Sequence, residues 1–289
     1  MSISIVIPAK DESAVIKEVV LEIKKLFVGA ELIVVCDGSS DDTASLAEDA
    51  GAKVIRKPYS MGNGAAIKTG FRAASGDIVV FMDGDGQHSP SDISSLLEKL
   101  DEGFDMVVGA RGRDGQANAG RGAANKFYNT LASYITGQNV EDLTSGFRAV
   151  RASKFREFLS LLPNGFSYPT TSTMAFFRAG YPVAYVPILV KKRIGKSHIN
   201  LVRDGIRFLL IIFKVGTLYS PLKMFVPLSF IVFILGLIRY FYTFSVSGEF
   251  TNMSAILFVS SLLIFLMGLI SEQISSLVYQ LSTFKKNDE

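Results

Sequence analysis

The sequence predicts an α/β fold, a mostly parallel sheet with helices on both faces, followed by an interfacial amphipathic helix and a hairpin of two transmembrane helices. Three observations support this prediction. Short β-branched segments alternate with helical patterns up to about residue 151, a basic stripe marks an apolar helix after residue 201, and two long apolar segments follow it. Alternating strands and helices are typical of a sheet covered by helices on both faces.

The predicted strands are short runs rich in β-branched residues. They cover residues 3–7, 32–35, 54–55, 78–82 and 106–108. Segments 15–26 and 92–100 are the clearest helices between them, because their apolar residues recur every three or four positions and so share one helix face. The capping group of the second helix is Ser89, Ser91 or Asp92.

Residues 201–222 are predicted to form a helix that lies in the membrane interface. When this segment is wound as an α-helix, Arg203, Arg207 and Lys214 fall in a narrow stripe and apolar residues cover most of the remaining surface. A basic stripe on an apolar helix is typical of an interfacial helix. A core helix with three snorkelling cations is the alternative.

Residues 223–289 are predicted to form a transmembrane hairpin and a cytoplasmic tail, with spans at about 224–244 and 253–271. The spans contain one charged residue, Arg239, and about 20 apolar residues suffice to cross a bilayer core. A buried core hairpin is the alternative. Lysines flank the hairpin on both sides, whereas its connector has no Lys or Arg. The positive-inside rule therefore predicts an integral protein of the cytoplasmic (inner) membrane, with residues 1–200 and both termini cytoplasmic.

Composition narrows the classes of function. Hydrophobic residues make up 48% of the chain and concentrate after residue 201, so the average combines a sheet domain with a membrane part. The net charge of +3 argues against a general nucleic-acid binder. The single cysteine, Cys36, precludes an intramolecular disulfide and fits a reducing compartment.

Polar motifs follow three of the predicted strands, at residues 8–12, 36–39 and 83–87. Ligands of open α/β sheets bind beyond the carboxyl ends of the strands, so these motifs mark one candidate site. Asp83, Asp85 and Gln87 offer side-chain oxygens, which are the donors that hard divalent cations take in proteins. A polar turn without a cation is the alternative for the same residues.

These motifs, together with residues 142–148 and 193–197, resemble the family 2 glycosyltransferases with a GT-A (Rossmann-like) fold. More narrowly, they resemble the polyprenyl-phosphate glycosyltransferases related to dolichyl-phosphate mannose synthase, of the two-span membrane type. The resemblance extends over about residues 3–205. It implies that residues 1–200 are the glycosyltransferase domain.

The resemblance implies a nucleotide-sugar site in which Asp83, Asp85 and Gln87 hold Mg²⁺ or Mn²⁺. The donor-binding residues that it implies are Pro8, Ala9, Glu12, Asp37, Gly62, Gly64 and Asp83. Glycines in the loop 61–64 let the backbone approach a flat ligand, and a plain strand-to-helix turn is the alternative. The chain departs from the family at Cys36, where an acid is usual, and this leaves the identity of the nucleotide open.

The acceptor that the resemblance implies is a polyprenyl phosphate, either undecaprenyl or dolichyl phosphate. A phosphate monoester is largely dianionic at neutral pH, so it needs positioning cations but no general base. The residues proposed to bind the acceptor and the diphosphate are Arg121, Arg148, Arg193, Lys196 and Ser197, and the alternative for each cation is solvated surface charge. The predicted catalytic residues are Asp85, Arg111, Asp142 and Ser145.

Together these expectations describe a metal-dependent, inverting transfer of a hexose, by default from a UDP-linked donor, to polyprenyl phosphate at the cytoplasmic face of a bilayer. A processive polysaccharide synthase is one alternative, but the chain has no Trp for the Gln-x-x-Arg-Trp motif of those enzymes. A non-catalytic nucleotide-sugar-binding scaffold and a sugar nucleotidyltransferase are the others. Relatives can assemble as homo-oligomers, although no segment here specifies a number of subunits.

Overall fold

The computed structural model describes residues 1–112, 119–165, 167–190, 210, 213, 216–217 and 220–287, with side chains for all of these except 119–124 and 278–287. The chain divides into two compact units. The first contains Met1–Thr130 and Gln138–Phe208, and the second contains Leu131–Gly137 and Leu209–Glu289. The predicted interfacial helix, residues 201–222, lies almost entirely outside the described residues.

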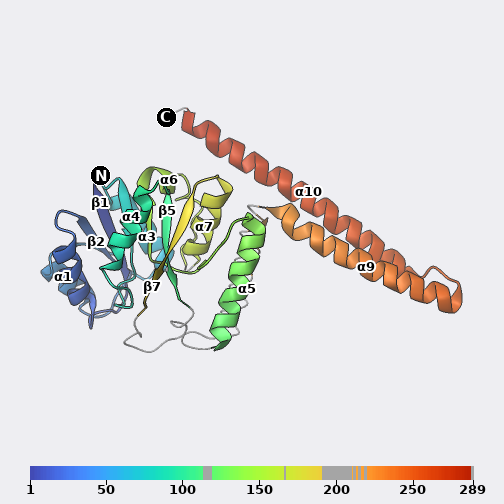
Figure 1. Ribbon diagram of the computed structural model, residues 1–289, viewed down its shortest axis with the longest axis horizontal. Coiled ribbons are helices and arrows are strands. Elements are labelled where there is room, and N and C mark those ends of the chain that lie inside the picture. Colours follow the sequence, from blue (N-terminus) through green and yellow to red (C-terminus); the bar gives the residue numbers. More distant parts are fainter. Residues whose placement is uncertain are drawn as a thin grey trace. The chain divides into compact units, whose positions relative to one another are not determined.

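A seven-stranded sheet forms the centre of the first unit, in the order β3-β2-β1-β4-β6-β5-β7 (Figure 1). Its strands are β1 Ile3–Ala9, β2 Glu31–Cys36, β3 Lys53–Arg56, β4 Ile78–Phe81, β5 Met106–Arg111, β6 Arg148–Arg151 and β7 Val183–Ile188. All neighbouring strands are parallel except β6, which runs antiparallel to both β4 and β5. The predicted α/β fold with a mostly parallel sheet is therefore confirmed.

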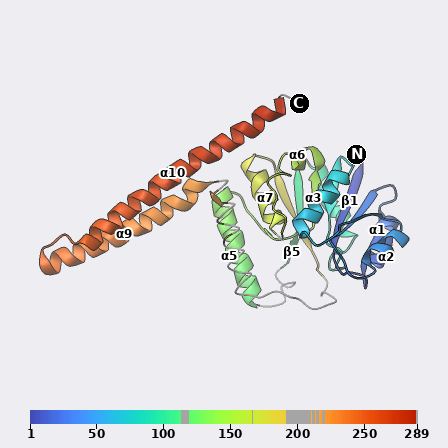
Figure 2. The same cartoon turned by 180° about the vertical axis from the view of Figure 1, so that it is seen from behind.

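Helices cover both faces of this sheet (Figures 1 and 2). They are α1 Ile16–Leu26, α2 Thr43–Asp49, α3 Asn63–Ala73, α4 Asp92–Asp101, α6 Ala152–Arg156 and α7 Tyr168–Arg178, while α5 Ala119–Thr136 extends from the first unit into the second. The apolar face predicted for residues 15–26 is the buried face of α1. Burial of such faces against the strands is the main source of stability for the layers.

The sequence does not predict strands β6 and β7. β6 has only four residues and begins and ends with arginine, so it shows no apolar run. β7 contains Pro187, which lowers its strand propensity but is tolerated because β7 is an edge strand. The antiparallel β6 has a functional consequence, because the loop before it, residues 142–147, reaches the same edge of the sheet as the end of β4.

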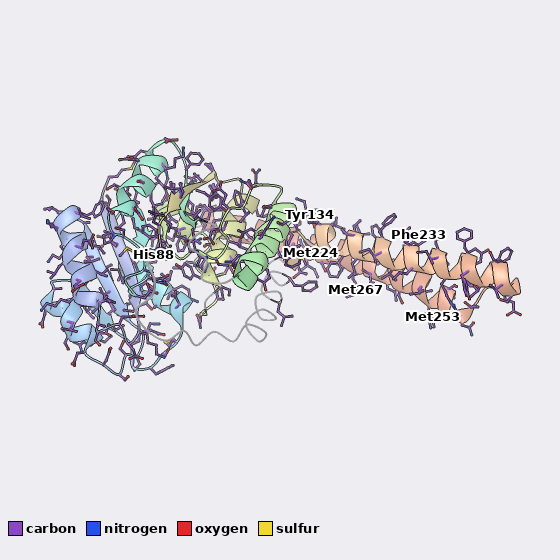
Figure 3. All side chains as sticks on the ribbon, turned by 60° about the horizontal axis from the view of Figure 1, so that its bottom comes forward. His88, Tyr134, Met224, Phe233, Met253 and Met267 are labelled. Carbon is purple, nitrogen blue, oxygen red and sulfur yellow. The ribbon has the colours of Figure 1, made fainter. Side chains whose placement is uncertain are left out.

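Two long helices, α9 Pro221–Ser247 and α10 Asn252–Asn287, form a hairpin in the second unit. Both are long and apolar enough to cross a membrane, and the predicted spans lie within them. Gly236 packs against Phe258, and Gly268 packs against Phe225, so small residues bring the helices together. The hydroxyl of Ser261 donates across the pair to the carbonyl of Ser229 at 2.9 Å. Large apolar side chains such as Phe233 and Met253 remain exposed along this hairpin (Figure 3).

Candidate active site

Asp83 and Asp85 lie directly after β4, at the carboxyl edge of the sheet, and both are half-buried. The backbone N–H of Gln87 donates to Oδ1 of Asp85 at 3.1 Å, which closes a tight turn. This turn places the predicted metal ligands Asp83, Asp85 and Gln87 on one short loop. Their roles as ligands stay predictions.

The carboxylate of Asp83 lies between three segments of the chain. The Nδ2 of Asn63, at the start of α3, donates to Oδ1 at 3.5 Å, and Nε2 of His88 lies 3.9 Å from Oδ2. A Cβ atom added to Gly146 would lie 2.9 Å from Oδ2, so only glycine leaves room for the carboxylate there. Asp83 is thus held where α3, the loop after β4 and the loop before β6 meet.

His88 is a site residue that the sequence reasoning leaves out, because a lone histidine carries no specific signal. The structure buries it, with 8% of its surface exposed, inside the first unit (Figure 3). Its ring stacks on the ring of Phe147, with centroids 5.0 Å apart and an angle of 18° between the planes. Burial lowers the pKa of His88 to about 4, so the imidazole is neutral at physiological pH.

The donor set at this edge fits a hard divalent cation. Asp83 and Asp85 supply carboxylate oxygens and Gln87 supplies an amide oxygen, and each of the three is partly accessible. Within the described ranges, no group of three or more His, Cys, Asp or Glu side chains forms a metal site by itself. Mg²⁺ and similar ions use one or two carboxylates and complete their coordination with substrate phosphates and water, which such a sparse set permits.

Arg111 and Asp142 form a bidentate ion pair. Nε of Arg111 lies 2.7 Å from Oδ2 of Asp142, and Nη2 lies 2.8 Å from Oδ1. Nη2 also donates to the hydroxyl of Thr144. Burial alone raises the pKa of the Asp142 carboxyl, but the bonds and charge of Arg111 outweigh this and lower it, so Asp142 is ionised.

Asp142 also organises the loop before β6. Its Oδ1 accepts hydrogen bonds from the backbone N–H groups of Thr144 and Ser145, both at 3.1 Å. With only 6% of its surface exposed, Asp142 is a poor candidate for a general base. The structure therefore places two of the predicted catalytic residues, Arg111 and Asp142, together, with Ser145 beside them.

Arg148 requires a correction to the prediction that it binds phosphate. It is 0% exposed, and its guanidinium donates to the carbonyls of Ser145 and Pro169 and to the hydroxyls of Ser172 and Thr173. These internal partners hold it between β6 and α7. A phosphate group cannot reach it, so Arg148 acts as an internal brace for the loop that carries Ser145.

Asp37 positions the loop 60–62 with both of its carboxylate oxygens. The backbone N–H groups of Met61 and Gly62 donate to it at 2.9 and 2.8 Å, and the Ser60 hydroxyl donates at 2.9 Å. Burial raises the pKa of Asp37, but these hydrogen bonds overcome that effect and lower it. Because its side chain is 4% exposed and fully engaged, Asp37 shapes the predicted donor site through this loop.

The chain itself occupies the space on the Cβ side of Gly62 and Gly64. A Cβ atom on Gly64 would lie 2.1 Å from the carbonyl oxygen of Pro163, and one on Gly62 would lie 2.5 Å from that of Asn164. The N–H of Gly64 donates to the carbonyl of Gly165 at 3.1 Å. These glycines therefore admit the backbone of residues 163–165 on one side, and their contact with the donor stays a prediction.

The end of β1 connects the other donor motifs. The carbonyl of Ala9 accepts the N–H of Asp37 at 2.9 Å, and that of Pro8 accepts the N–H of Gly84 at 3.3 Å. The N–H of Glu12 donates to the Thr43 hydroxyl at 2.8 Å. Pro8, Ala9 and Glu12 thus lie between the loops that follow β2 and β4.

Four predicted residues cannot be placed in this site. Arg193, Lys196 and Ser197 lie outside the described residues, and so does the side chain of Arg121 on α5. Their proposed contacts with the acceptor or the diphosphate stay predictions.

Comparison with known proteins decides the family. Residues 4–159 match glycosyl transferase family 2, and residues 220–277 match the GtrB C-terminal hairpin. The chain belongs to glycosyltransferase family 2. It is a glycosyltransferase with a GT-A fold, and the matched hairpin together with its two long apolar helices indicates membrane association.

Several relatives cover most of this family 2 chain. Glycosyltransferase AglJ of Haloferax volcanii is 30% identical over 96% of this chain and 94% of its own length. Dolichyl-phosphate hexose transferase of the same organism is 28% identical over 70% of this chain and 89% of its own length. Polyprenol monophosphomannose synthase of Mycolicibacterium smegmatis is 29% identical over 65% of this chain and 77% of its own length.

Solved structures show the same fold. Glucosyl-3-phosphoglycerate synthase from Mycobacterium tuberculosis, crystallised with Mn²⁺, UDP and glucosyl-3-phosphoglycerate, is 27% identical and superposes with a TM-score of 0.62 over 74% of this chain and 80% of its own. Another crystal of that enzyme contains Mg²⁺ and UDP. Divalent cations therefore occur in solved relatives of this chain.

Proposed function

We propose that this chain transfers a hexose, with inversion, from a nucleoside diphosphate sugar to a polyprenyl phosphate at the cytoplasmic face of a membrane. One observation carries the proposal. The same chain contains a family 2 domain, with Asp83 and Asp85 at the carboxyl ends of its strands, and a GtrB-type membrane hairpin. The names of two relatives, dolichyl-phosphate hexose transferase and polyprenol monophosphomannose synthase, support the class of acceptor.

In this proposal, Asp83, Asp85 and Gln87 hold Mg²⁺ or Mn²⁺ beside the diphosphate of the donor. A divalent cation bound there supplies Lewis-acid stabilisation of the negative charge on the departing nucleoside diphosphate. Residues 8–12 and the loop 60–62, which Asp37 holds in place, line the nucleotide. UDP is the nucleotide that we expect, since UDP occupies the solved relatives.

The acceptor attacks through a phosphate oxygen. That oxygen forms a bond to the anomeric carbon as the bond between this carbon and the diphosphate oxygen breaks, so no proton needs to move. The pair of Arg111 and Asp142 suits this reaction, because Nε and Nη2 of Arg111 are fixed and, within the described residues, Nη1 has no protein partner. A guanidinium held in this way binds a phosphate through charge-assisted hydrogen bonds without protonating it.

The test measures sugar transfer to lipid. Purified full-length protein in detergent receives undecaprenyl or dolichyl phosphate and a panel of nucleotide-sugars, and mass spectrometry identifies the sugar-phosphate lipid. Asp85→Asn is expected to lower transfer by about 10²-fold or more, because the cation that Asp85 would hold stabilises the developing charge, and losing a stabilising group of this kind costs on this scale. Excess EDTA is expected to have a similar effect.

Asp101→Asn, the same chemical change at an exposed position at the end of α4, is the matched control and is expected to retain activity. Circular dichroism then verifies that both variants melt like the wild type. Undiminished transfer by Asp85→Asn, or transfer in excess EDTA, would remove the metal from the mechanism.

A soluble phosphorylated acid is a second candidate acceptor. The observation that favours it is the similarity to glucosyl-3-phosphoglycerate synthase, which was crystallised with phosphoglyceric acid. The same assay separates the two candidates, because a lipid product partitions into the organic phase and a glycosylated acid stays in water. The membrane hairpin makes the lipid the preferred acceptor.

A further inference from the structure

Asp83 meets two different side chains with its two oxygens. Oδ1 accepts from the amide of Asn63 at 3.5 Å, whereas Oδ2 lies 3.9 Å from Nε2 of His88. Gly146 lies beside Oδ2, where an added Cβ atom would come within 2.9 Å. The position of His88 is therefore one of the constraints on the orientation of this carboxylate.

Two successive packing contacts fix the ring of His88. The ring stacks almost flat on Phe147, and Phe147 in turn lies over Gly109, where an added Cβ atom would come within 2.7 Å of the ring carbon Cδ1. Gly109 on β5 thus makes room for Phe147, and Phe147 sets the plane of the imidazole. A buried ring that is packed in this way has a fixed orientation, so the same nitrogen always faces Asp83.

That nitrogen is Nε2, and the chemistry of the pair assigns the proton to it. Only an imidazole nitrogen that carries a proton attracts a carboxylate, so the contact with Asp83 requires an N–H at Nε2. The other nitrogen, Nδ1, is buried and has no hydrogen-bond partner in the described part of the chain, so no protein donor or acceptor selects the opposite tautomer.

We propose that His88 is a positioning residue that donates from Nε2 to Oδ2 of Asp83 and thereby presents this carboxylate to the divalent cation and the diphosphate of the donor. The proposal rests on the proposed function. The distance of 3.9 Å shortens to that of a hydrogen bond when the donor binds, as hydrogen bonds in ligand-free active sites commonly do.

The test uses binding of Mn²⁺ in the presence of UDP, measured by titration calorimetry or by the electron paramagnetic resonance of free Mn²⁺. In His88→Gln the side-chain amide reaches the position of Nε2, and in His88→Asn it reaches only the position of Nδ1. We expect the Mn²⁺ affinity of His88→Gln to lie within about threefold of that of the wild type. We expect His88→Asn and His88→Leu to bind Mn²⁺ about 10-fold or more weakly, which is the usual effect of losing a residue that hydrogen-bonds to a metal ligand.

A double-mutant cycle with Asp83→Asn shows whether the effect passes through Asp83. In the Asp83→Asn background, His88→Leu is expected to cause no further loss, because the two changes act on one interaction. Melting by circular dichroism verifies that each variant is folded. Three results would each overturn the inference. The first is equal Mn²⁺ binding by the wild type and His88→Asn, and the second is an equal loss of binding in His88→Gln and His88→Leu. The third is a further loss of binding when His88→Leu is added to Asp83→Asn.

The two proposals fail in different ways. If the wild type itself binds no Mn²⁺ with UDP, the proposed donor site fails and His88 has nothing to position. If the wild type and Asp83→Asn differ as expected but His88→Asn behaves like the wild type, only the role of His88 is wrong.

Discussion

Gly146 shows how one residue without a side chain sets the geometry of the candidate site. The position that its Cβ atom would take lies 2.9 Å from Oδ2 of Asp83 and 3.2 Å from the hydroxyl of Tyr168. The nearest atom belongs to the mobile end of an aspartate side chain, whereas the Tyr168 hydroxyl is held by its bond to the Gly146 carbonyl at 2.9 Å. A methyl group at position 146 would therefore displace the carboxylate before it disturbs the fold.

We predict that Gly146→Ala lowers sugar transfer by about 10-fold or more while the melting temperature stays close to that of the wild type, because a displaced metal ligand costs affinity on this scale. Transfer assays and circular dichroism measure the two quantities. Gly165→Ala is the control, since an added Cβ atom there meets nothing within 4 Å. A large fall in melting temperature for Gly146→Ala would show that position 146 matters for folding and not for Asp83.

Several site residues could be predicted from the sequence because they follow strands of clear pattern. Asp83 and Asp85 come directly after β4, and Arg111 ends β5. The pairing of Arg111 with Asp142 could not be predicted, because it depends on the antiparallel register of β5 and β6. His88 gave no signal for the same physical reason: its role depends on burial against Phe147, which is distant in sequence.

At the scale of elements, Glu31 ties together the amino-terminal half of the sheet. This first residue of β2 accepts from the Ser4 hydroxyl on β1 at 2.7 Å, from the N–H of Ser75 at 2.8 Å and from Nζ of Lys53 on β3 at 3.1 Å. Burial raises the pKa of Glu31, but these bonds outweigh burial and lower it to about 2. The ionised form is thus the one that the fold favours.

We predict that Glu31→Gln destabilises the protein at pH 7 by on the order of 1–3 kcal/mol, since several charge-assisted hydrogen bonds are lost. The folded pKa of about 2 lies below the ordinary value of 4.5, so this stabilisation is complete above about pH 4.5 and is lost as the pH falls towards 2. Thermal melting of both proteins across this range measures the difference. A gap in stability that persists unchanged at pH 2 would contradict the assignment.

The packing beside Gly62 and Gly64 also belongs to the scale of elements. The family resemblance implies a donor contact for these glycines, and glycine lets the backbone approach a flat ligand. The turn also receives residues 163–165, about a hundred positions later in the chain, and Nζ of Lys68 binds this segment through Oδ1 of Asn164 at 2.6 Å. Contacts between segments so far apart leave no local pattern to recognise.

At the scale of the whole molecule, the hairpin indicates association with a membrane. Its helices expose many large apolar side chains, which water would not tolerate but lipid tails accept. The orientation of the hairpin follows only from the lysines that flank it, and so it stays a prediction. The chain offers a convenient background for testing it, because its single cysteine, Cys36, is 3% exposed.

We predict that a membrane-impermeant maleimide labels Glu249→Cys in intact cells but labels Val28→Cys only after permeabilisation. Glu249 lies in the connector between α9 and α10, which the positive-inside rule places outside, and Val28 is 89% exposed on the first unit. Labelling of the wild-type protein measures the background from Cys36. Labelling of Val28→Cys in intact cells would reverse the orientation.

The close approach of residues 62–64 to residues 163–165 has a consequence for recombination between relatives. An additional carbon atom at Gly62 or Gly64 would have no space beside the carbonyls of Asn164 and Pro163, so the two segments must be inherited as a matched pair. Chimeras that cross over between positions 65 and 162 would join halves shaped for different counterparts. Exchanging the hairpin after residue 165 keeps the pair intact, and that is where transplantation of a membrane anchor from another species should succeed.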